Sequence, residues 1–190
     1  SIGISLLAFL FLFKIGEAFL GRMSLIFYKE IGFTKSDIGI FSKGLGWVTT
    51  VLFTLIGGFL TVKIGLVRSI FIAGIFMAVT NLLFSLLFWT GKNYLIFSIG
   101  VILDDLEAAF ATVAFVAFIS VLVNRQYTAT QYALLASIGT LGRTTLASSS
   151  GSLVDYLNGD WGLFFIITCL MVIPSLILIF FLKEKIKALN

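Results

Sequence analysis

The chain alternates between long apolar runs and short polar connections. Each of six runs reaches the roughly 20 mostly apolar residues that an α-helix needs to cross a bilayer. The runs cover residues 2–28, 36–62, 68–90, 94–123, 130–155 and 162–182. The connections contain turn-forming glycines, among them Gly32, Gly65, Gly91 and Gly159. Membrane β-strands would instead show segments of about 10 residues with alternating polarity. The pattern therefore predicts an all-α membrane protein with six transmembrane helices over residues 1–190, ending in a basic tail at 183–190.

Composition excludes the soluble alternatives. Hydrophobic residues make up 59% of the chain and charged residues 12%, and the mean hydropathy is +1.13. A soluble domain has about a quarter of its residues charged. A chain of 190 residues also has too small an interior to hide this much apolar surface. The net charge of +4 comes from basic residues spread along the ends of apolar runs, which excludes the basic patch of a nucleic-acid-binding domain.

The side chains offer little catalytic chemistry. The chain has no His and one Cys, Cys169. Triads built on imidazole, histidine metal sites, internal disulfides and cysteine metal clusters are therefore excluded. We expect no metal, no cofactor and no enzymatic activity.

Basic residues in the connections predict the orientation in the membrane, because Lys and Arg are enriched in cytoplasmic loops. One side would receive six of them: Lys63, Arg68, Arg125, Lys183, Lys185 and Lys187. The other side would receive three: Lys29, Lys35 and Lys92. We therefore expect both ends of the chain, including the tail at 183–190, on the cytoplasmic side.

The six predicted helices divide into two triplets that would cross the membrane in opposite directions. Such an arrangement is what an inverted-topology repeat requires. The first helix of each triplet carries the acids that lie inside apolar runs. These are Glu17 in the first helix, and Asp104, Asp105 and Glu107 in the fourth. The pattern predicts a 3+3 inverted repeat.

Ionisable residues inside spanning segments cost about 2.5–3.5 kcal/mol each to insert, and they mark polar pathways. At a rise of 1.5 Å per residue, Lys14 and Arg143 lie about 18 Å from the cytoplasmic ends of their helices, and Asp104 lies about 15 Å from the outer end of its own. These similar depths predict one central site. Its candidates for a coupling proton are Glu17, Asp104 and Glu107; its candidates for binding an anionic substrate are Lys14, Asp105 and Arg143.

Structural interpretations of the same charges stay open. Lys14 and Glu17 are three residues apart and can neutralise each other within one helix. Arg22 lies toward the outer end of the same helix and on a different face. We expect it to snorkel to the interface rather than bind a ligand.

The connection between the second and third runs resembles a motif of the major facilitator superfamily. Its sequence is Gly58-Phe-Leu-Thr-Val-Lys-Ile-Gly65-Leu-Val-Arg68. It is similar to the second copy of the loop motif Gly-x-x-x-Asp-x-x-Gly-x-x-Arg, with Val62 at the acidic position. The resemblance implies that Gly58, Gly65 and Arg68 act at the cytoplasmic face, without the acidic partner of a full motif.

Three further stretches resemble the C-terminal half of the AmpG-type muropeptide permeases. They are Phe13-Lys-Ile-Gly-Glu-Ala-Phe19, Ala114-Phe-Val-Ala-Phe118 and Tyr127-Thr-Ala-Thr-Gln-Tyr-Ala-Leu-Leu135. The resemblance implies one half of a major-facilitator-type bundle, namely helices 7–12 of twelve, whose partner is a missing N-terminal six-helix half. It also implies import of anhydro-muropeptides for peptidoglycan recycling across a bacterial inner membrane, driven by a proton gradient. By position, Asp104 and Glu17 match acidic residues of the family.

Other functions stay open from the sequence alone. Acetyl-CoA transporters are related to the same family, so the cargo can be another anionic solute. Three alternatives come from different classes: a stand-alone six-helix channel, a non-catalytic membrane assembly subunit, and a polytopic membrane enzyme, whose catalysis would have to rest on the carboxylates of the fourth helix alone. The chain begins without Met inside an apolar run, which favours a fragment with sequence missing upstream.

Overall fold

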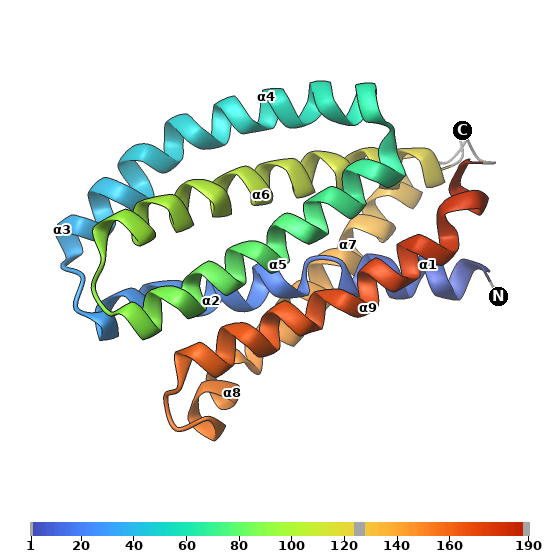
Figure 1. Ribbon diagram of the computed structural model, residues 1–190. Helices are drawn as coiled ribbons and strands as arrows, with labels where there is room; N and C mark the ends of the chain where they lie inside the picture. Colours follow the sequence, from blue (N-terminus) through green and yellow to red (C-terminus); the bar gives the residue numbers. More distant parts are fainter. Residues whose placement is uncertain (1, 124–127, 188–190) are drawn as a thin grey trace.

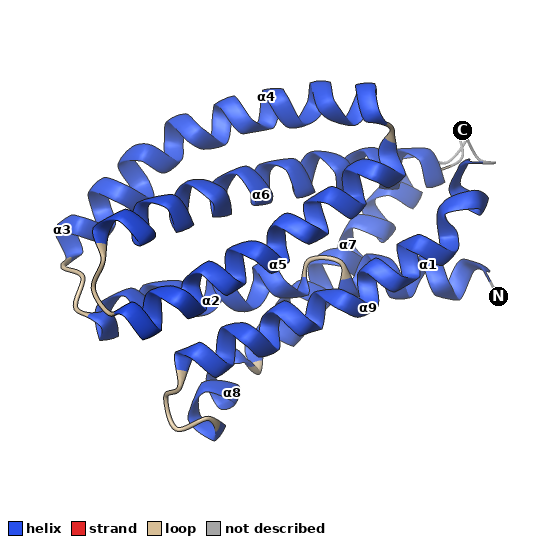
Figure 2. Ribbon diagram, viewed as in Figure 1, coloured by secondary structure: helices blue, strands red, loops and turns tan. Residues whose placement is uncertain are grey.

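The computed structural model describes residues 2–123 and 128–187, and every regular element in these ranges is a helix (Figures 1 and 2). The elements in chain order are α1 (Ile2–Leu12), α2 (Ile15–Ile31), α3 (Lys35–Ile38), the π-helix η1 (Gly39–Leu45), α4 (Gly46–Ile64), α5 (Leu66–Thr90), α6 (Tyr94–Leu122), α7 (Thr128–Ser148), α8 (Ser150–Tyr156) and α9 (Trp161–Lys187). They form six helical rods: α1 with α2, α3 to α4 through η1, α5, α6, α7 with α8, and α9.

Five of the six rods are long and apolar enough to cross a membrane. Within the described residues these spans are Ile4–Ile31, Lys35–Ile64, Leu66–Thr90, Tyr94–Leu122 and Trp161–Glu184. The remaining rod contains α7, whose 21 residues are rich in Thr and Ser. The predicted tail at 183–190 is helical as far as Lys187, because α9 continues through it, and residues 188–190 lie outside the described residues.

Two of the predicted helices are interrupted. The run predicted as one helix over 130–155 breaks at Ser149, between α7 and α8. There the hydroxyl groups of Ser148, Ser149 and Ser150 each donate to a carbonyl three residues earlier, and such side-chain bonds compete with the helix and bend it. The run predicted over 2–28 breaks at Phe13 and Lys14, where Lys14 leaves the helical backbone with φ −96° and ψ 19°.

The helices contact one another in a pattern that repeats between the two halves of the chain. The first rod packs against the fifth and sixth, and the fourth rod packs against the second and third. The third and sixth rods, α5 and α9, pack against each other and run side by side in Figure 1. Exchanging the two triplets leaves these pairs unchanged. This is the pairing expected of a 3+3 inverted repeat and is consistent with half of a major-facilitator-type bundle.

The apolar core consists of two clusters at different heights. One cluster is rich in packed aromatic rings, including Phe27 and Phe165 with ring centroids 4.7 Å apart. The other gathers around Phe9, Phe13 and Phe118. In α6, the acids Asp104, Asp105 and Glu107 lie between the residues that this helix gives to the two clusters, and Lys14 lies between the clusters at the break before α2. Glu17 follows in the first turn of α2, beside the first residues of the aromatic cluster. The fold therefore places a polar layer between two apolar halves.

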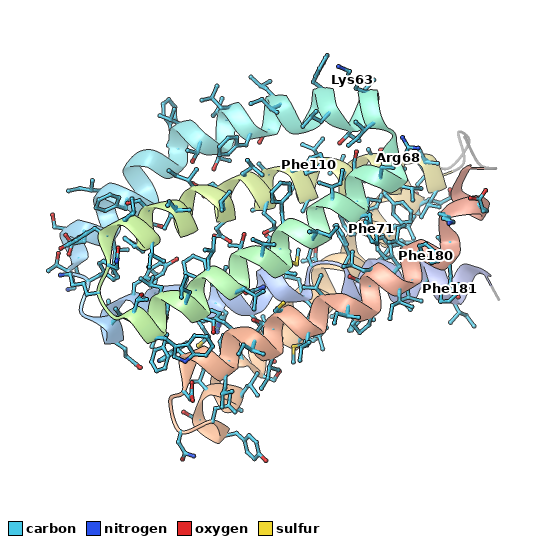
Figure 3. All side chains as sticks on the ribbon, in the orientation of Figure 1. Lys63, Arg68, Phe71, Phe110, Phe180 and Phe181 are labelled. Atoms are coloured by element: carbon cyan, nitrogen blue, oxygen red, sulfur yellow. The ribbon has the colours of Figure 1, made fainter. Side chains whose placement is uncertain are left out.

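The predicted loop motif covers the end of α4, a tight turn at Gly65 and the start of α5, at one end of the bundle. Figure 3 shows Lys63 and Arg68 at the same end as Phe180 and Phe181. Gly65 joins α4 to α5 with φ +89°, a left-handed backbone that residues with a Cβ rarely adopt. In the described part of the chain, Arg68 makes no ion pair.

Candidate functional site

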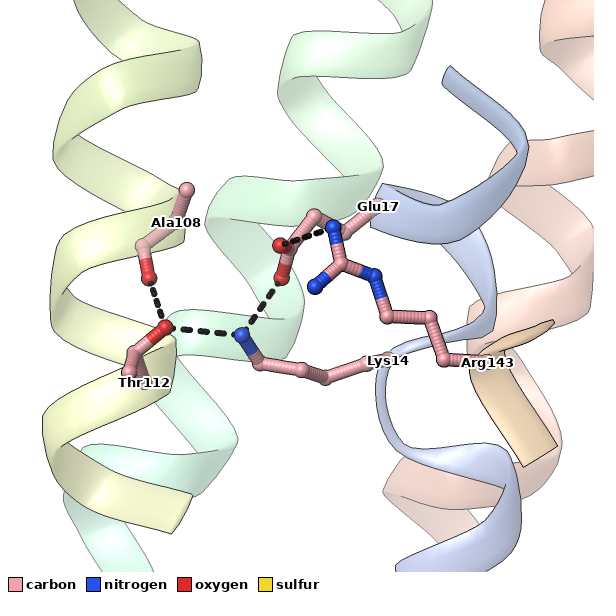
Figure 4. A network of polar contacts seen from close by, with 5 residues as sticks. All are labelled: Lys14, Glu17, Ala108, Thr112 and Arg143. Carbon is pink, nitrogen blue, oxygen red and sulfur yellow. Dashed lines mark hydrogen bonds and ion pairs between the residues drawn. The ribbon is translucent and has the colours of Figure 1, made fainter. Parts of the chain in front are cut away.

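Three helices contribute to one network of polar contacts (Figure 4). Lys14 Nζ lies 2.9 Å from Glu17 Oε2, and Arg143 Nη2 of α7 lies 3.6 Å from Glu17 Oε1. Lys14 Nζ also donates a hydrogen bond of 2.7 Å to Thr112 Oγ1 of α6. Thr112 in turn donates to the carbonyl oxygen of Ala108, at 2.7 Å. The network therefore joins the break in the first rod to the fourth and fifth rods.

The break in the first rod determines the positions of Lys14 and Glu17. Lys14 precedes α2, and Glu17 lies in the first turn of α2, where the positive end of the helix dipole stabilises a carboxylate. The side chains of Lys14 and Glu17 are only 13% and 12% exposed, whereas that of Arg143 is 50% exposed. Lys14 and Glu17 are thus held inside the bundle, while Arg143 remains accessible from the open side of the chain.

The three acids of α6 have different surroundings. Glu107 is 1% exposed, and its Oε1 atom has no hydrogen-bond partner among the residues that the structure describes. The charged groups that act on it are Glu17, Asp104 and Lys14. Asp104 is half-buried and makes no hydrogen bond or ion pair within the described residues. Glu107 and Asp104 therefore adjoin the network without being bonded into it.

Asp105 faces a different helix. Its Oδ2 atom accepts a hydrogen bond of 2.6 Å from Thr49 Oγ1 of α4. Gly46 of the same helix lies so close that an added Cβ would be 3.2 Å from Asp105 Oδ2. Asp105 thus ties the fourth rod to the second, and its predicted role in substrate binding stays a prediction.

Sequence reasoning did not find all the polar contacts around this site. Thr49 and Thr112 were missed because hydroxyl residues are common in these helices and usually bond to their own backbone, as Thr112 also does. Arg22, which the sequence predicted to snorkel, lines a pocket together with Arg143. Among the described residues, no group of three or more acids and cysteines is placed to hold a metal ion.

Comparisons with known proteins identify the family. No family model matches the chain. The chain is 34% identical over 181 residues to the putative transporter AmpG 4 of Rickettsia felis, an alignment that covers 95% of this chain and 43% of that protein. It is 30% identical over 183 residues to the anhydromuropeptide permease of Escherichia coli K12, covering 96% of this chain and 37% of that protein. The chain belongs to the AmpG-type transporter family.

This membership confirms the family that the sequence stretches resemble. A third relative, the putative transporter AmpG 1 of Rickettsia prowazekii, is 32% identical over 183 residues, which cover 96% of this chain and 41% of that protein. The chain spans about two fifths of the length of these curated relatives. This AmpG-type chain is a multi-pass membrane protein, in agreement with its apolar helices.

Proposed function

We propose that the chain is the C-terminal half of a proton-coupled permease that imports anhydromuropeptides across a bacterial inner membrane for peptidoglycan recycling. The observation that carries this proposal is the contact of Lys14, Glu17 and Arg143 at the break in the first rod. Broken helices whose ends meet charged groups near the middle of the membrane are where secondary transporters bind their cargo. The AmpG-type relatives, one of them named an anhydromuropeptide permease, support the choice of cargo.

The open polar face of α7 supports a partner half. Arg143, Thr140, Thr144 and Ser148 are all exposed on the surface of this chain. A charge in contact with lipid at the membrane centre costs about 2.5–3.5 kcal/mol, so this face needs water or protein against it. In the proposal, an N-terminal six-helix half covers the face and leaves a water-filled chamber between the halves.

Different charged residues bind the cargo and carry the proton. Arg143 is half exposed and lies 3.6 Å from Glu17, so it is accessible to an anionic group of the cargo. Lys14 is mostly enclosed by Glu17 and Thr112 and balances the charge of Glu17. Asp104 has no cationic partner among the described residues, so it can take up a proton without breaking an ion pair. Asp104 is therefore the carrier of the coupling proton, with Glu107 behind it.

The two halves would rock against each other to expose the chamber to either side in turn. Both ends of this chain lie in the cytoplasm in the proposal, as the basic residues of its connections favour. Gly58 near the end of α4, Gly65 in the turn and Arg68 at the start of α5 then lie toward the cytoplasmic face, where the turn limits the movement of α4 against α5.

The Asp104→Asn variant tests the proton carrier. We expect it to lose uptake driven by a proton gradient in membrane vesicles, because the amide cannot release a proton. Exchange of labelled for unlabelled anhydromuropeptide across the same vesicles should persist, since exchange needs no net proton transfer. Wild-type uptake by this variant would refute the role of Asp104.

A matched control is Asp155→Asn, which makes the same change on an exposed side chain of α8, away from the network. It should transport like the wild type. A wild-type protein that moves no anhydromuropeptide in either assay would overturn the proposed cargo. Passive, gradient-independent flux in the wild type would favour a channel instead.

A further inference from the structure

We infer that the pocket between α2 and α7 is a subsite for a carboxylate of the cargo, held between the guanidinium groups of Arg22 and Arg143. The inference rests on the proposed function and names the part of the cargo that this half recognises. The pocket has a volume of about 370 Å³. Its lining residues are Ala18, Gly21, Arg22, Thr140, Arg143, Thr144, Ala147 and Ser148.

The direction of Arg22 follows from the helix that carries it. Side chains on an α-helix tilt toward its N-terminus, so Arg22 of α2 leans toward Ala18, one turn earlier, which also lines the pocket. The outer end of α2 at Ile31 lies in the opposite direction, about 14 Å away along the helix axis. A snorkelling side chain would have to run against this tilt. Arg22 is therefore placed to meet a ligand in the pocket.

The pocket contains a positive group, Arg22, that can bind an anion. Arg22 makes no ion pair among the residues that the structure describes. Arg143 has Glu17 as a partner at 3.6 Å, beyond the distance of a strong charge-assisted hydrogen bond. Arg22 of α2 and Arg143 of α7 line the pocket from its two helices, and guanidinium groups suit a planar carboxylate because each presents parallel N–H donors.

Hydroxyl groups supply the complementary acceptors. Thr140, Thr144 and Ser148 each donate their hydroxyl proton to a carbonyl of their own helix, at 3.0, 2.8 and 2.6 Å. Their oxygens then offer lone pairs, which accept hydrogen bonds. The pocket thus combines donors for a carboxylate with acceptors for N–H groups beside it. The carboxyl end of a short peptide has this pattern, whereas an uncharged sugar ring does not.

The size of the pocket agrees with a peptide end. Ligand pockets of about 300–1,000 Å³ enclose small molecules, so 370 Å³ holds one end of a muropeptide rather than all of it. Binding would draw Arg143 from Glu17 to the cargo. Arg22 then selects cargo that carries the peptide. The movement of Arg143 leaves Glu17 with Lys14 as its remaining ion-pair partner among the described residues.

The first test is binding to the purified full-length protein, with N-acetyl-alanyl-alanine and its C-terminal amide as probes. We expect the acid to bind more tightly than the amide, and Arg22→Gln to weaken binding of the acid about 10- to 100-fold while leaving the amide unchanged. Lys29→Gln, which removes a positive charge from the last turn of α2, is the matched control and should bind like the wild type. Arg22→Lys should recover part of the affinity. Equal binding of acid and amide by the wild type, or unchanged binding of the acid by Arg22→Gln, would overturn the subsite.

The second test is transport of two cargoes, a peptide-bearing anhydromuropeptide and the same sugar without its peptide. In Arg22→Gln the KM for the peptide-bearing cargo should rise about 10- to 100-fold, with kcat little changed and the peptide-free cargo unaffected. An equal rise for both cargoes would contradict a carboxylate subsite. Failure of the wild type to transport either cargo refutes the proposed function alone, because the binding test still decides the subsite.

Discussion

Replacing Glu17 by Gln should lower the transport of anhydromuropeptide about 100-fold, in gradient-driven uptake and in exchange alike. The carboxylate is the counter-charge of both Lys14 and Arg143. Removing one partner of a buried ion pair costs about 3–5 kcal/mol, and the half-exposed Arg143 brings this down to about 3 kcal/mol. When this free energy is lost from the arrangement of charges that transports cargo, the population of that arrangement, and with it the rate, falls by roughly two orders of magnitude, at about 1.4 kcal/mol per factor of ten. Initial rates in membrane vesicles, divided by the amount of protein in the membrane, provide the measurement.

Gradient-driven uptake and exchange, measured together, distinguish the role of Glu17 from that of Asp104. A variant at the proton carrier keeps exchange, whereas a variant at the counter-charge loses both activities. The double variant Glu17→Gln with Arg143→Gln should lose less than the two single losses combined, because the second change removes a charge that the first has left without a partner. Exchange at the wild-type rate in Glu17→Gln would contradict its proposed role.

The fold was predictable because its signals are local. The helix over 94–122 begins where the sequence predicts, since Asn93 accepts hydrogen bonds from the backbone N–H groups of Leu95 and Ile96. Turn glycines with positive φ, such as Gly32 and Gly91, mark the ends of other helices. The breaks at Lys14 and Ser149 were missed, because neither position carries Pro or Gly. The break at Ser149 accompanies the hydroxyl bonds of three adjacent serines, which residue type alone does not reveal. The break at Lys14 lies where α1 and α2 contact α7, a segment far away in the sequence.

The sequence predicted how deep in the membrane the site residues lie, but not which neighbouring helix each of them contacts. Counting residues along the helices places Lys14, Arg143 and Asp104 at similar depths. The structure joins Lys14 and Arg143 through Glu17. Neighbouring residues on a helix point about 100° apart, so Asp104 and Asp105 cannot share one face. Asp105 contacts α4, whereas Asp104 stays on the side of the network. Packing between the rods decides which of these two acids contacts a neighbouring helix, and the sequence alone does not predict that packing.

The contact between α1 and α7 supports the whole site, and Gly142 makes this contact possible. A Cβ added at Gly142 would overlap the carbonyl oxygen of Phe11, two residues before the break. Gly139, one turn earlier, lies against the ring of Phe115 and the carbonyl oxygen of Leu10. Backbone atoms cannot rotate away as the tip of a side chain can. A larger residue at 142 therefore has to push the two helices apart.

We expect Gly142→Ala to lower the free energy of unfolding by about 3 kcal/mol, the upper end of the cost of overpacking a well-packed interior. Chemical denaturation of the purified full-length protein in detergent provides the measurement. Gly21→Ala is the matched control, because nothing lies within 4 Å of a Cβ added there. That change should raise stability by about 0.5–1 kcal/mol, as Ala favours a helix interior over Gly. Equal effects of the two variants would mean that α1 and α7 do not meet as closely as the structure indicates.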